Sequence, residues 1–336
     1  MVAEKPRRTT VADVARLAGV SAMTVSNVLN APHRVAPPTV QTVRAAIKEL
    51  GYIPNHAARA LSSGRSQVIG LPLYFEDDDN DTGLGGFLHG LLGGLVKAAA
   101  RSGYGVHVTT PAEVVRSEIA AAEIALYEKL IAARQVDAIV VLETMPHDPR
   151  IEFLSRRPFP FVAFGQTAAD QRQCWVDVDN ATSMAQIAGF LQSTGRERAV
   201  YLATDSALPW VHQRQDGFVR QFPSTDVRSF GSLEAVAAYV EEAGLPDVFV
   251  ADNDAYAVVA MRTLQRRGIV VGQDVAVTGF NDFPFASMLD TPLTTARIPL
   301  ADIADHLFER ALHEIAGDPD EPGRLVTAPL VIRSSA

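Results

Sequence analysis

The sequence predicts two folds in one chain: a small all-α head built on a helix-turn-helix, followed by an α/β core with parallel sheets. Two short amphipathic helical segments flank Gly19 near the N-terminus. Residues 1–65 carry nine Lys and Arg against three Asp and Glu, a net charge of +6, whereas the whole 336-residue chain carries −9, which leaves −15 on the remainder. From Val68 onward, short apolar runs alternate with helical stretches, the pattern of parallel sheets covered by helices on both faces.

Capping residues and apolar spacing predict the first two helices. Thr10 caps the first helix, Asp13 stands in the capping-box position, and Gly19 ends the helix. Ser21 caps the second, whose first turns would enter the major groove if the pair is a helix-turn-helix. The apolar face of this second helix is Val25, Val28 and Leu29. Such helix pairs also occur in ordinary helical proteins, but the sorting of basic charge into the head favours contact with phosphates.

A third helix is predicted over about residues 38–50, and a short helix follows it. Pro54 restricts Asn55, which can cap a helix of about eight residues that Gly64 can end. This is below the dozen or so residues that an isolated helix needs in water. We therefore expect this helix to form only when two copies pack together on DNA, the alternative being a flexible linker.

Composition excludes several classes of protein. A single cysteine, Cys174, leaves no disulfide framework and indicates a reducing compartment. The N-terminus lacks the apolar segment of a signal peptide, and no apolar run reaches the roughly 18 residues of a membrane span. No HExxH, CxxC or GxSxG motif is present. We expect a cytoplasmic protein with no membrane segment, no metal, no cofactor and no enzymatic activity.

Eight apolar runs predict the strands of the core: 68–75, 106–110, 138–142, 161–164, 175–178, 199–203, 248–251 and 276–280. Open sheets of this kind bind ligands beyond the carboxyl ends of their strands. Asn253 and Asp254 follow one run, while Asn281 and Asp282 follow another. We expect both pairs at the edge of a ligand cleft. Capping of a turn or helix is the alternative, and it is strongest for Asp254.

The segment TTVADVARLAGVSAMTVSNVLN at 9–30, followed by Val35, Thr39 and KELGYIPN at 48–55, resembles the lactose repressor (LacI) family. Residues 249–268 and 275–299 resemble it too. The resemblance implies a DNA-binding head (1–54), a hinge helix and linker (55–66), and an effector-binding and dimerisation core (67–336). That core would have the fold of periplasmic binding proteins, with two Rossmann-like subdomains at about 67–166 plus 300–323 and 167–299 plus 324–336. The chain would cross between them near 166–175, 295–300 and 323–326.

The resemblance also implies how the head meets DNA. The base-reading positions fall on Ala22, Met23, Asn27 and His33. Asn27 is suited to adenine, whereas arginine, frequent there in relatives, favours guanine. Hydroxyl and amide side chains expected on phosphates are Ser21, Thr24, Ser26 and Asn30. In the hinge, Ala58, Arg59 and Leu61 would meet the minor groove, with Leu61 as the wedge between bases.

Effector contacts are expected across the cleft. Arg214 matches an arginine that holds effector oxygens in relatives, and its guanidinium suits vicinal hydroxyls or a carboxylate. The other expected contacts are Asn253, Asn281, Asp282, Gln166, Phe230 and Trp210. Gln166, Asn281 and Ile298 depart from the residues common in relatives, so effector chemistry does not transfer from one of them. The acidic run at 76–81 argues weakly against an anionic ligand.

The resemblance implies a ligand-responsive, sequence-specific regulator of transcription, expected to repress genes of carbohydrate metabolism. A homodimer would bind a pseudo-palindromic operator in double-stranded DNA. A small sugar-like effector would change operator affinity through the hinge helix. The alternative is a regulator switched by a protein partner, with no small-molecule effector. The effector, the operator and the sign of the response are left open by the sequence.

Overall fold

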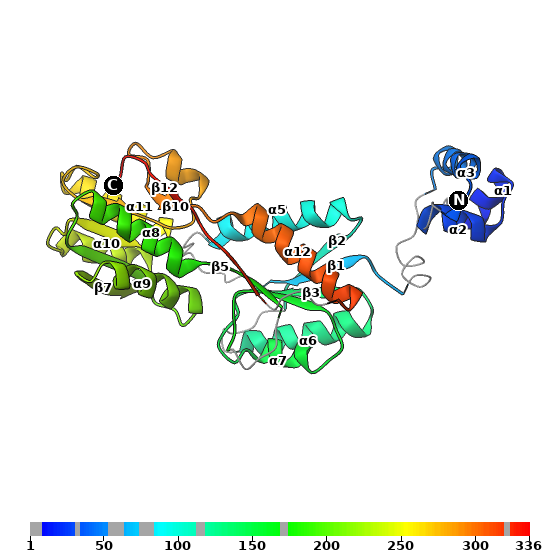
Figure 1. The fold of residues 1–336 in the computed structure, drawn as a ribbon, viewed down its shortest axis with the longest axis horizontal. Helices are drawn as coiled ribbons and strands as arrows, with labels where there is room; N and C mark the ends of the chain where they lie inside the picture. The colour runs from blue at the N-terminus through cyan, green and yellow to red at the C-terminus, as the bar shows by residue number, and fades with distance from the viewer. Residues whose placement is uncertain are drawn as a thin grey trace, which may run out of the picture. The chain divides into compact units, whose positions relative to one another are not determined.

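The computed structural model describes residues 9–30, 34–52, 64–73, 84–111, 118–168, 174–318 and 323–336. The chain forms two compact units, Met1–Ser66 and Gln67–Ala336 (Figure 1). Some residues expected at functional sites lie outside the described ranges: His33, Ala58, Arg59, Leu61 and the acidic run at 76–81.

The head is a three-helix unit. Its helices are α1 (Val11–Ala18), α2 (Ala22–Asn30) and α3 (Pro37–Glu49). The predicted capping box is present, since Thr10 and Asp13 each bond the backbone of the other, and Gly19 ends α1 in the left-handed conformation with φ 65°. The Thr24 N–H donates to Ser21 Oγ at 3.0 Å, which caps α2 as expected. The buried core of this unit is Val14, Ala15, Val25, Val28, Val43, Ala46 and Tyr52.

The first lobe of the core is a six-stranded parallel sheet with the order β11-β5-β4-β3-β1-β2. Its strands are β1 (Val68–Pro72), β2 (Gly105–Thr109), β3 (Ala138–Val141), β4 (Phe161–Phe164), β5 (Trp175–Val178) and β11 (Gly323–Val326). Helices α5 (Leu84–Arg101) and α12 (Leu300–Ala316) cover one face, while α6 (Ile119–Ala132) and α7 (Pro149–Ser155) cover the other (Figure 1). Strand β3 shows why both faces need helices: Ala138 and Val140 enter one core and Ile139 and Val141 the other.

The second lobe is a four-stranded parallel sheet with the order β7-β6-β8-β9. Its strands are β6 (Ala199–Thr204), β7 (Thr225–Phe230), β8 (Val248–Ala251) and β9 (Ala276–Thr278). Helices α8 (Asn180–Ser193) and α9 (Pro209–Gln221) pack on one face, with α10 (Leu233–Glu242) and α11 (Asp254–Arg266) on the other. A 3-10 helix, η3 (Pro284–Ser287), and an antiparallel pair, β10 (Thr295–Ala296) with β12 (Leu330–Val331), complete the lobe.

The chain passes between the lobes three times, as expected. Two of the three crossings lie a few residues further along the chain than expected. It leaves the first lobe between β5 and α8, returns between β10 and α12, and leaves again between β11 and β12. Strand β5 pairs with β4, and β11 pairs with β5. These strands therefore belong to the first lobe, and the expected boundaries at 167 and 324 move to about 179 and 327. An apolar run does not reveal which sheet it joins, because pairing is decided in three dimensions.

The eight predicted strands are all present within the described residues, although 74–75 lie outside them. Strand β7 was not expected. Its sequence TDVRSF is half-exposed on the edge of its sheet and carries Asp226 and Arg228, so it shows no apolar run. Within the described residues, no helix is long and apolar enough to cross a membrane.

Close packing of α9 on α8 depends on one glycine. A Cβ at Gly217 would lie 2.4 to 2.8 Å from backbone atoms of Ala181, whereas a Cβ at Gly189, also on this helix pair, would meet nothing within 4 Å. Gly217→Ala should lower the free energy of unfolding by about 2 kcal/mol or more, because a backbone cannot yield as a side chain can. Gly189→Ala should raise it by up to about 1 kcal/mol through helix propensity. Urea unfolding of both variants tests this, and equal stabilities would contradict it.

Candidate functional site

The exposed start of α2 is the candidate DNA-reading surface of the head. Ala22 and Met23 are exposed, Met23 to 69%, while Asn27 is half-buried. Val25 and Val28 point into the core, so the outward and inward residues separate as the helical spacing predicts. Ser21 Oγ and Thr24 Oγ1 lie 2.9 Å apart at the helix start. Ser26 is half-buried on the same helix, and the side chain of Asn30 is not described.

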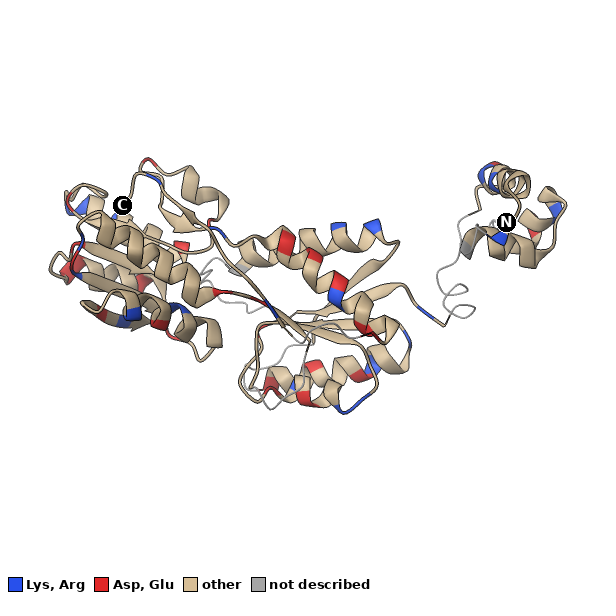
Figure 2. Ribbon diagram, viewed as in Figure 1, with Lys and Arg blue, Asp and Glu red and all other residues tan. Residues whose placement is uncertain are grey.

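Basic residues outnumber acidic residues in the described part of the head (Figure 2). Its basic residues are Arg16, Arg34, Arg44 and Lys48, and its acidic residues are Asp13 and Glu49. Asp13 is already paired with Arg16. The head therefore offers positive charge to a polyanion, as the sequence predicts.

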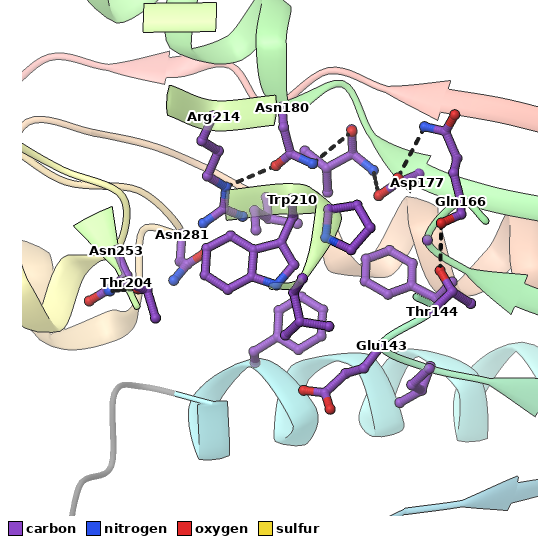
Figure 3. A pocket seen from close by; sticks show the side chains of 18 of the residues that line it. Glu143, Thr144, Gln166, Asp177, Asn180, Thr204, Trp210, Arg214, Asn253 and Asn281 are labelled. Carbon is purple, nitrogen blue, oxygen red and sulfur yellow. Dashed lines mark hydrogen bonds between the residues drawn. The ribbon is translucent and has the colours of Figure 1, made fainter. Parts of the chain in front are cut away.

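The core holds a pocket of about 150 Å³ where the carboxyl ends of strands from both lobes meet (Figure 3). Its first-lobe wall includes Thr144 after β3 and Gln166 after β4, and its second-lobe wall includes Trp210 and Arg214 of α9. The exposed wall surface is mostly apolar, and polar side chains of both lobes converge on the space. The aromatic lining residues are Phe87, Phe164, Trp210 and Phe283, and the polar ones are Glu143, Thr144, Gln166, Asp177, Asn180, Thr204, Arg214, Asn253 and Asn281.

Arg214 is the charged centre of the second-lobe wall. Its side chain is buried, with the residue 5% exposed. Its Nε donates to Asn180 Oδ1 at 2.9 Å and its Nη1 donates to the Asp252 carbonyl oxygen at 2.6 Å. The guanidinium carbon lies 3.8 Å from the centre of the Phe280 ring and 4.5 Å from that of Trp210. Burial lowers the pKa of Arg214 to about 10, so it stays charged at neutral pH.

The buried carboxylate of Asp252 holds two residues of this wall, Thr204 and Asn253, through hydrogen bonds. Asp252 accepts hydrogen bonds from the Thr204 backbone N–H at 2.6 Å, from Thr204 Oγ1 at 3.0 Å and from Asn253 Nδ2 at 2.9 Å. Burial raises the pKa of Asp252 to about 6, against the effect of these donors and of Arg214. Asn253 Oδ1 accepts the Tyr256 N–H and so caps α11. Asn253 therefore both lines the pocket and caps α11, so the cleft position and the capping role expected as alternatives occur together.

Asp177 occupies the opposite side of the pocket, at the end of β5. Its Oδ2 accepts from Gln166 Nε2 at 3.1 Å and its Oδ1 from the Val178 N–H at 2.7 Å (Figure 3). Burial raises the pKa of Asp177 to about 6, although both donors and the more distant Arg214 lower it. Asn180 Nδ2 donates to the Val178 carbonyl oxygen at 3.2 Å. A chain of polar contacts thus runs from Gln166 across the junction of the lobes to Arg214.

Five of the seven expected effector residues line this pocket: Gln166, Trp210, Arg214, Asn253 and Asn281. Asp282 does not, because its carboxylate faces Arg297 at 2.6 Å and Arg333 at 2.7 Å. Phe230 does not, because its ring packs on Tyr239 and Tyr256 in the core behind β7. These two residues are therefore structural in this fold. The ring of Phe280, which follows β9, lies under the Arg214 guanidinium.

The backbone after β9 is strained where Asn281 and Asp282 stand. Their φ angles are 118° and 56°, a region that residues other than glycine rarely adopt. Two sets of contacts hold this turn in place. The Asn281 N–H donates to the Ala296 carbonyl oxygen at 2.9 Å, and Asp282 forms ion pairs with Arg297 and Arg333. The strained turn brings Asn281 to the pocket and directs Asp282 away from it.

Several polar residues of the pocket were not predicted from the sequence: Glu143, Thr144, Asp177, Asn180, Thr204 and the supporting Asp252. The available signal was their position, since each of the pairs Asp177 with Asn180 and Thr204 with Asp252 stands at or just beyond the end of a strand. The sequence led us to expect pocket residues only after β8 and β9. Within the described residues, no group of three His, Cys, Asp or Glu is placed to hold a metal ion.

Comparisons with known proteins agree with this architecture. Residues 10–55 match the family model of bacterial regulatory proteins, lacI family, and residues 188–336 match a periplasmic binding protein-like domain. The HTH-type transcriptional regulator CelR of Thermobifida fusca is 28% identical over 347 residues, which cover 99% of each chain. A solved complex of the transcriptional regulator CelR with cellobiose is 26% identical with a TM-score of 0.68, covering 98% of this chain and 100% of that one. The lac repressor dimer bound to operator and the anti-inducer ONPF shares the fold, with a TM-score of 0.82 at 21% identity over 98% of this chain and 99% of that one.

The raised pKa of Asp177 makes a prediction about stability. Because the folded protein binds this proton more tightly than the unfolded chain does, the contribution of Asp177 is fully present below about pH 4 and is lost as pH rises through about 6. The shift from 3.8 to about 6 corresponds to about 3 kcal/mol. Asp177→Asn keeps the shape of the side chain, and Gln166 can turn its amide to accept from it.

Relative to the natural protein, Asp177→Asn should therefore gain up to about 3 kcal/mol of stability between pH 4 and pH 7.5. Urea unfolding across this pH range measures the difference. The exposed Asp216 of α9 provides a matched control as Asp216→Asn. A stability difference for Asp177→Asn that does not change with pH would show that Asp177 is not buried as described.

Proposed function

The chain belongs to the LacI family of bacterial regulatory proteins, and from this premise we propose that it binds an operator through its head and a small sugar in its core pocket. It is a DNA-binding transcriptional regulator and not an enzyme. We propose that it represses genes of carbohydrate metabolism and that the sugar sets its affinity for the operator. The observation that carries the proposal is the buried Arg214, held by Asn180 and Asp252 with its guanidinium at the pocket wall.

The pocket suits a neutral polyhydroxy ligand. Sugars present hydroxyl groups at their edges and C–H groups on their faces, and Trp210 and Phe164 offer flat surfaces for those faces. Arg214 and Asn180 can form hydrogen bonds with the hydroxyl groups of a sugar, and the Asp177 carboxylate can accept hydrogen bonds from them. Glu143 and Asp177 oppose the charge of Arg214, so an anionic ligand would meet carboxylates as well as a cation. The CelR complex contains cellobiose, which agrees with this class.

A formed pocket with these groups favours a small-molecule effector over a protein partner as the switch. Most ligand pockets are largely apolar with a few placed polar groups, which is the composition of this one. A buried guanidinium at the wall of a formed cavity is suited to a small polar ligand. We therefore propose a small molecule, and not a protein partner, as the effector that switches operator binding.

We propose that the head and the hinge contact the operator through the residues expected from the sequence. Ala22, Met23, Asn27 and His33 would read bases, and Ser21, Thr24, Ser26 and Asn30 would bind phosphates. Ala58, Arg59 and Leu61 would enter the minor groove of a bent operator. Two copies of the chain would meet the two halves of a pseudo-palindromic site. Operator binding would place the protein with the nucleoid.

The switch follows from the way the chain connects the lobes. Three segments cross between them, and the effector pocket lies beside the crossing at β5 and α8. A ligand that contacts Arg214 on one lobe and Gln166 on the other favours one separation of the lobes. Such a ligand changes operator affinity only to the extent that it binds the two states with different affinity.

A sugar screen with one pair of variants tests the proposal. Thermal unfolding with mono- and disaccharides identifies ligands, and operator binding is then measured with each hit. Arg214→Ala should weaken sugar binding about 10- to 100-fold, because charge-assisted hydrogen bonds are lost, while operator affinity without sugar stays unchanged. Arg220→Ala, on the exposed side of the same helix, is the control. A normal sugar response in Arg214→Ala would remove Arg214 from the site, and no response to any sugar would reject the effector class.

A further inference from the structure

The turn after β9, residues 279–283, brings one side chain to the effector pocket and the next one to two arginines. Asn281 lines the pocket (Figure 3). Asp282 does not line it, and its side chain is 5% exposed. Arg297 Nε donates to Asp282 Oδ2 at 2.6 Å, and Arg333 Nη2 lies 2.7 Å from Asp282 Oδ1. Each oxygen of this carboxylate therefore faces one guanidinium group, and we call the three residues the Asp282 clamp.

The backbone of this turn needs support from its surroundings. Asn281 and Asp282 are consecutive and have φ angles of 118° and 56°. Such angles cost free energy in residues other than glycine, and they persist only where the surrounding structure enforces them. A turn that needed only this shape could use glycine, which adopts it without strain. The chain instead places a pocket amide and a buried carboxylate here, so contacts outside the turn must hold it.

Backbone hydrogen bonds tie the turn to the segment that leads from β10 to α12. The Asn281 N–H donates to the Ala296 carbonyl oxygen at 2.9 Å, and the Asn281 carbonyl oxygen accepts from the Ile298 N–H at 3.3 Å. These two bonds form a bridge between Asn281 and Arg297. Ile298 lines the pocket with Asn281, whereas Arg297 and Asp282 do not line it and pair with each other. The ion pair therefore secures this bridge through residues that do not line the pocket.

The buried carboxylate of Asp254 holds the end of the same turn. The Phe283 N–H donates to Asp254 Oδ2 at 2.9 Å, and Thr295 Oγ1 donates to Asp254 Oδ1 at 2.6 Å. A Cβ at Gly279 would lie 2.4 Å from Asp254 Oδ1, so the carboxylate needs a glycine at the start of the turn. The turn is thus fixed at its end by Asp254, and its two strained residues depend on the bridge and on the Asp282 clamp.

Arg297 is the member of the clamp that can be changed with least effect on the rest of the lobe. Its side chain is 57% exposed, whereas that of Arg333 is 15% exposed. Arg333 also donates from Nη1 to the Leu293 carbonyl oxygen at 2.6 Å, so its loss would remove a second contact. A ligand can bond Asn281 only in the fraction of molecules whose turn has this shape, and the apparent affinity falls in proportion to that fraction. Loss of Arg297 should therefore be seen in ligand affinity.

We propose that Asp282, held by Arg297 and Arg333, is a positioning residue of the effector site, which fixes the turn so that the Asn281 amide is presented to the sugar. The inference rests on the sugar effector proposed above. An amide side chain can both donate to a sugar hydroxyl and accept from it. Asp282 thus sets the affinity for the sugar through Asn281 and without contacting the sugar itself.

Calorimetric titration of the full chain with glucose, galactose, ribose and cellobiose tests this assignment, and the sugar that binds most tightly is used for the variants. Arg297→Met removes the charge and the donors of an exposed side chain, and it should weaken sugar binding about fivefold. Arg297→Lys keeps a charged donor and should stay within about twofold of the natural protein. Arg228→Met removes an exposed ion pair with Asp226 on β7 of the same lobe and is the control.

A double-mutant cycle shows whether the clamp acts through Asn281. Asn281→Gly removes the pocket amide at a φ angle that glycine adopts freely. This change should weaken sugar binding about tenfold. In the Asn281→Gly protein, Arg297→Met should change the affinity by less than about twofold, because the amide that the clamp positions is already gone. Thermal unfolding without sugar checks that each variant is folded, and Arg297→Gln replaces Arg297→Met if that variant is not.

The outcomes separate the positioning role from the sugar effector itself. Arg297→Met that binds the sugar as tightly as the natural protein would overturn the positioning role and leave the sugar effector standing. Arg297→Lys as weak as Arg297→Met would overturn it too, and so would an undiminished effect of Arg297→Met in the Asn281→Gly protein. Failure of all four sugars to bind the natural protein would reject them as effectors, and with them the role of Asp282 in their binding.

Discussion

The Arg214 guanidinium is buried inside the second lobe, and a charge in that position needs acceptors and polarisable neighbours around it. The neighbours come from four separate elements: Asn180 at the start of α8, the Asp252 carbonyl after β8, Phe280 after β9 and Trp210 on α9 itself. The strand ends and both helices must therefore be placed together for Arg214 to be satisfied. The close approach of α9 to α8 at Gly217 is one condition of that placement. The pocket is the space that this arrangement leaves between the lobes.

Local signals in the sequence were enough to predict most elements. The capping box of Thr10 and Asp13 and the left-handed Gly19 are decided within a few residues, and the apolar runs that became β3 and β8 are buried on both faces. Strand β7 could not be found in this way, because an exposed edge strand carries polar residues. The lobe to which β11 belongs was also out of reach, since its partner β5 lies 148 residues away in the chain (Gly323 pairs with Trp175).

The candidate site was predicted in part for a similar reason. Arg214 and Asn253 could be named from resemblance and from a strand end, and both line the pocket. Asp282 stands one residue from Asn281, yet its φ angle of 56° and its bonds to Arg297 and Arg333 direct it elsewhere. Asp177 was missed because nothing local distinguishes a carboxylate that will be buried at a lobe junction from one that will be solvated. Side-chain direction at a strained turn and burial between lobes are both tertiary properties.

In the function proposed here, the sugar site and the operator site are coupled through the two-lobed core. Thermodynamic linkage tests it most directly. The dissociation constant of the sugar is measured with and without a saturating operator duplex, and that of the operator with and without saturating sugar. If the two sites are coupled, both constants change in the same direction by the same factor, at least about fivefold. A sugar that binds with equal affinity whether or not operator is present would contradict it.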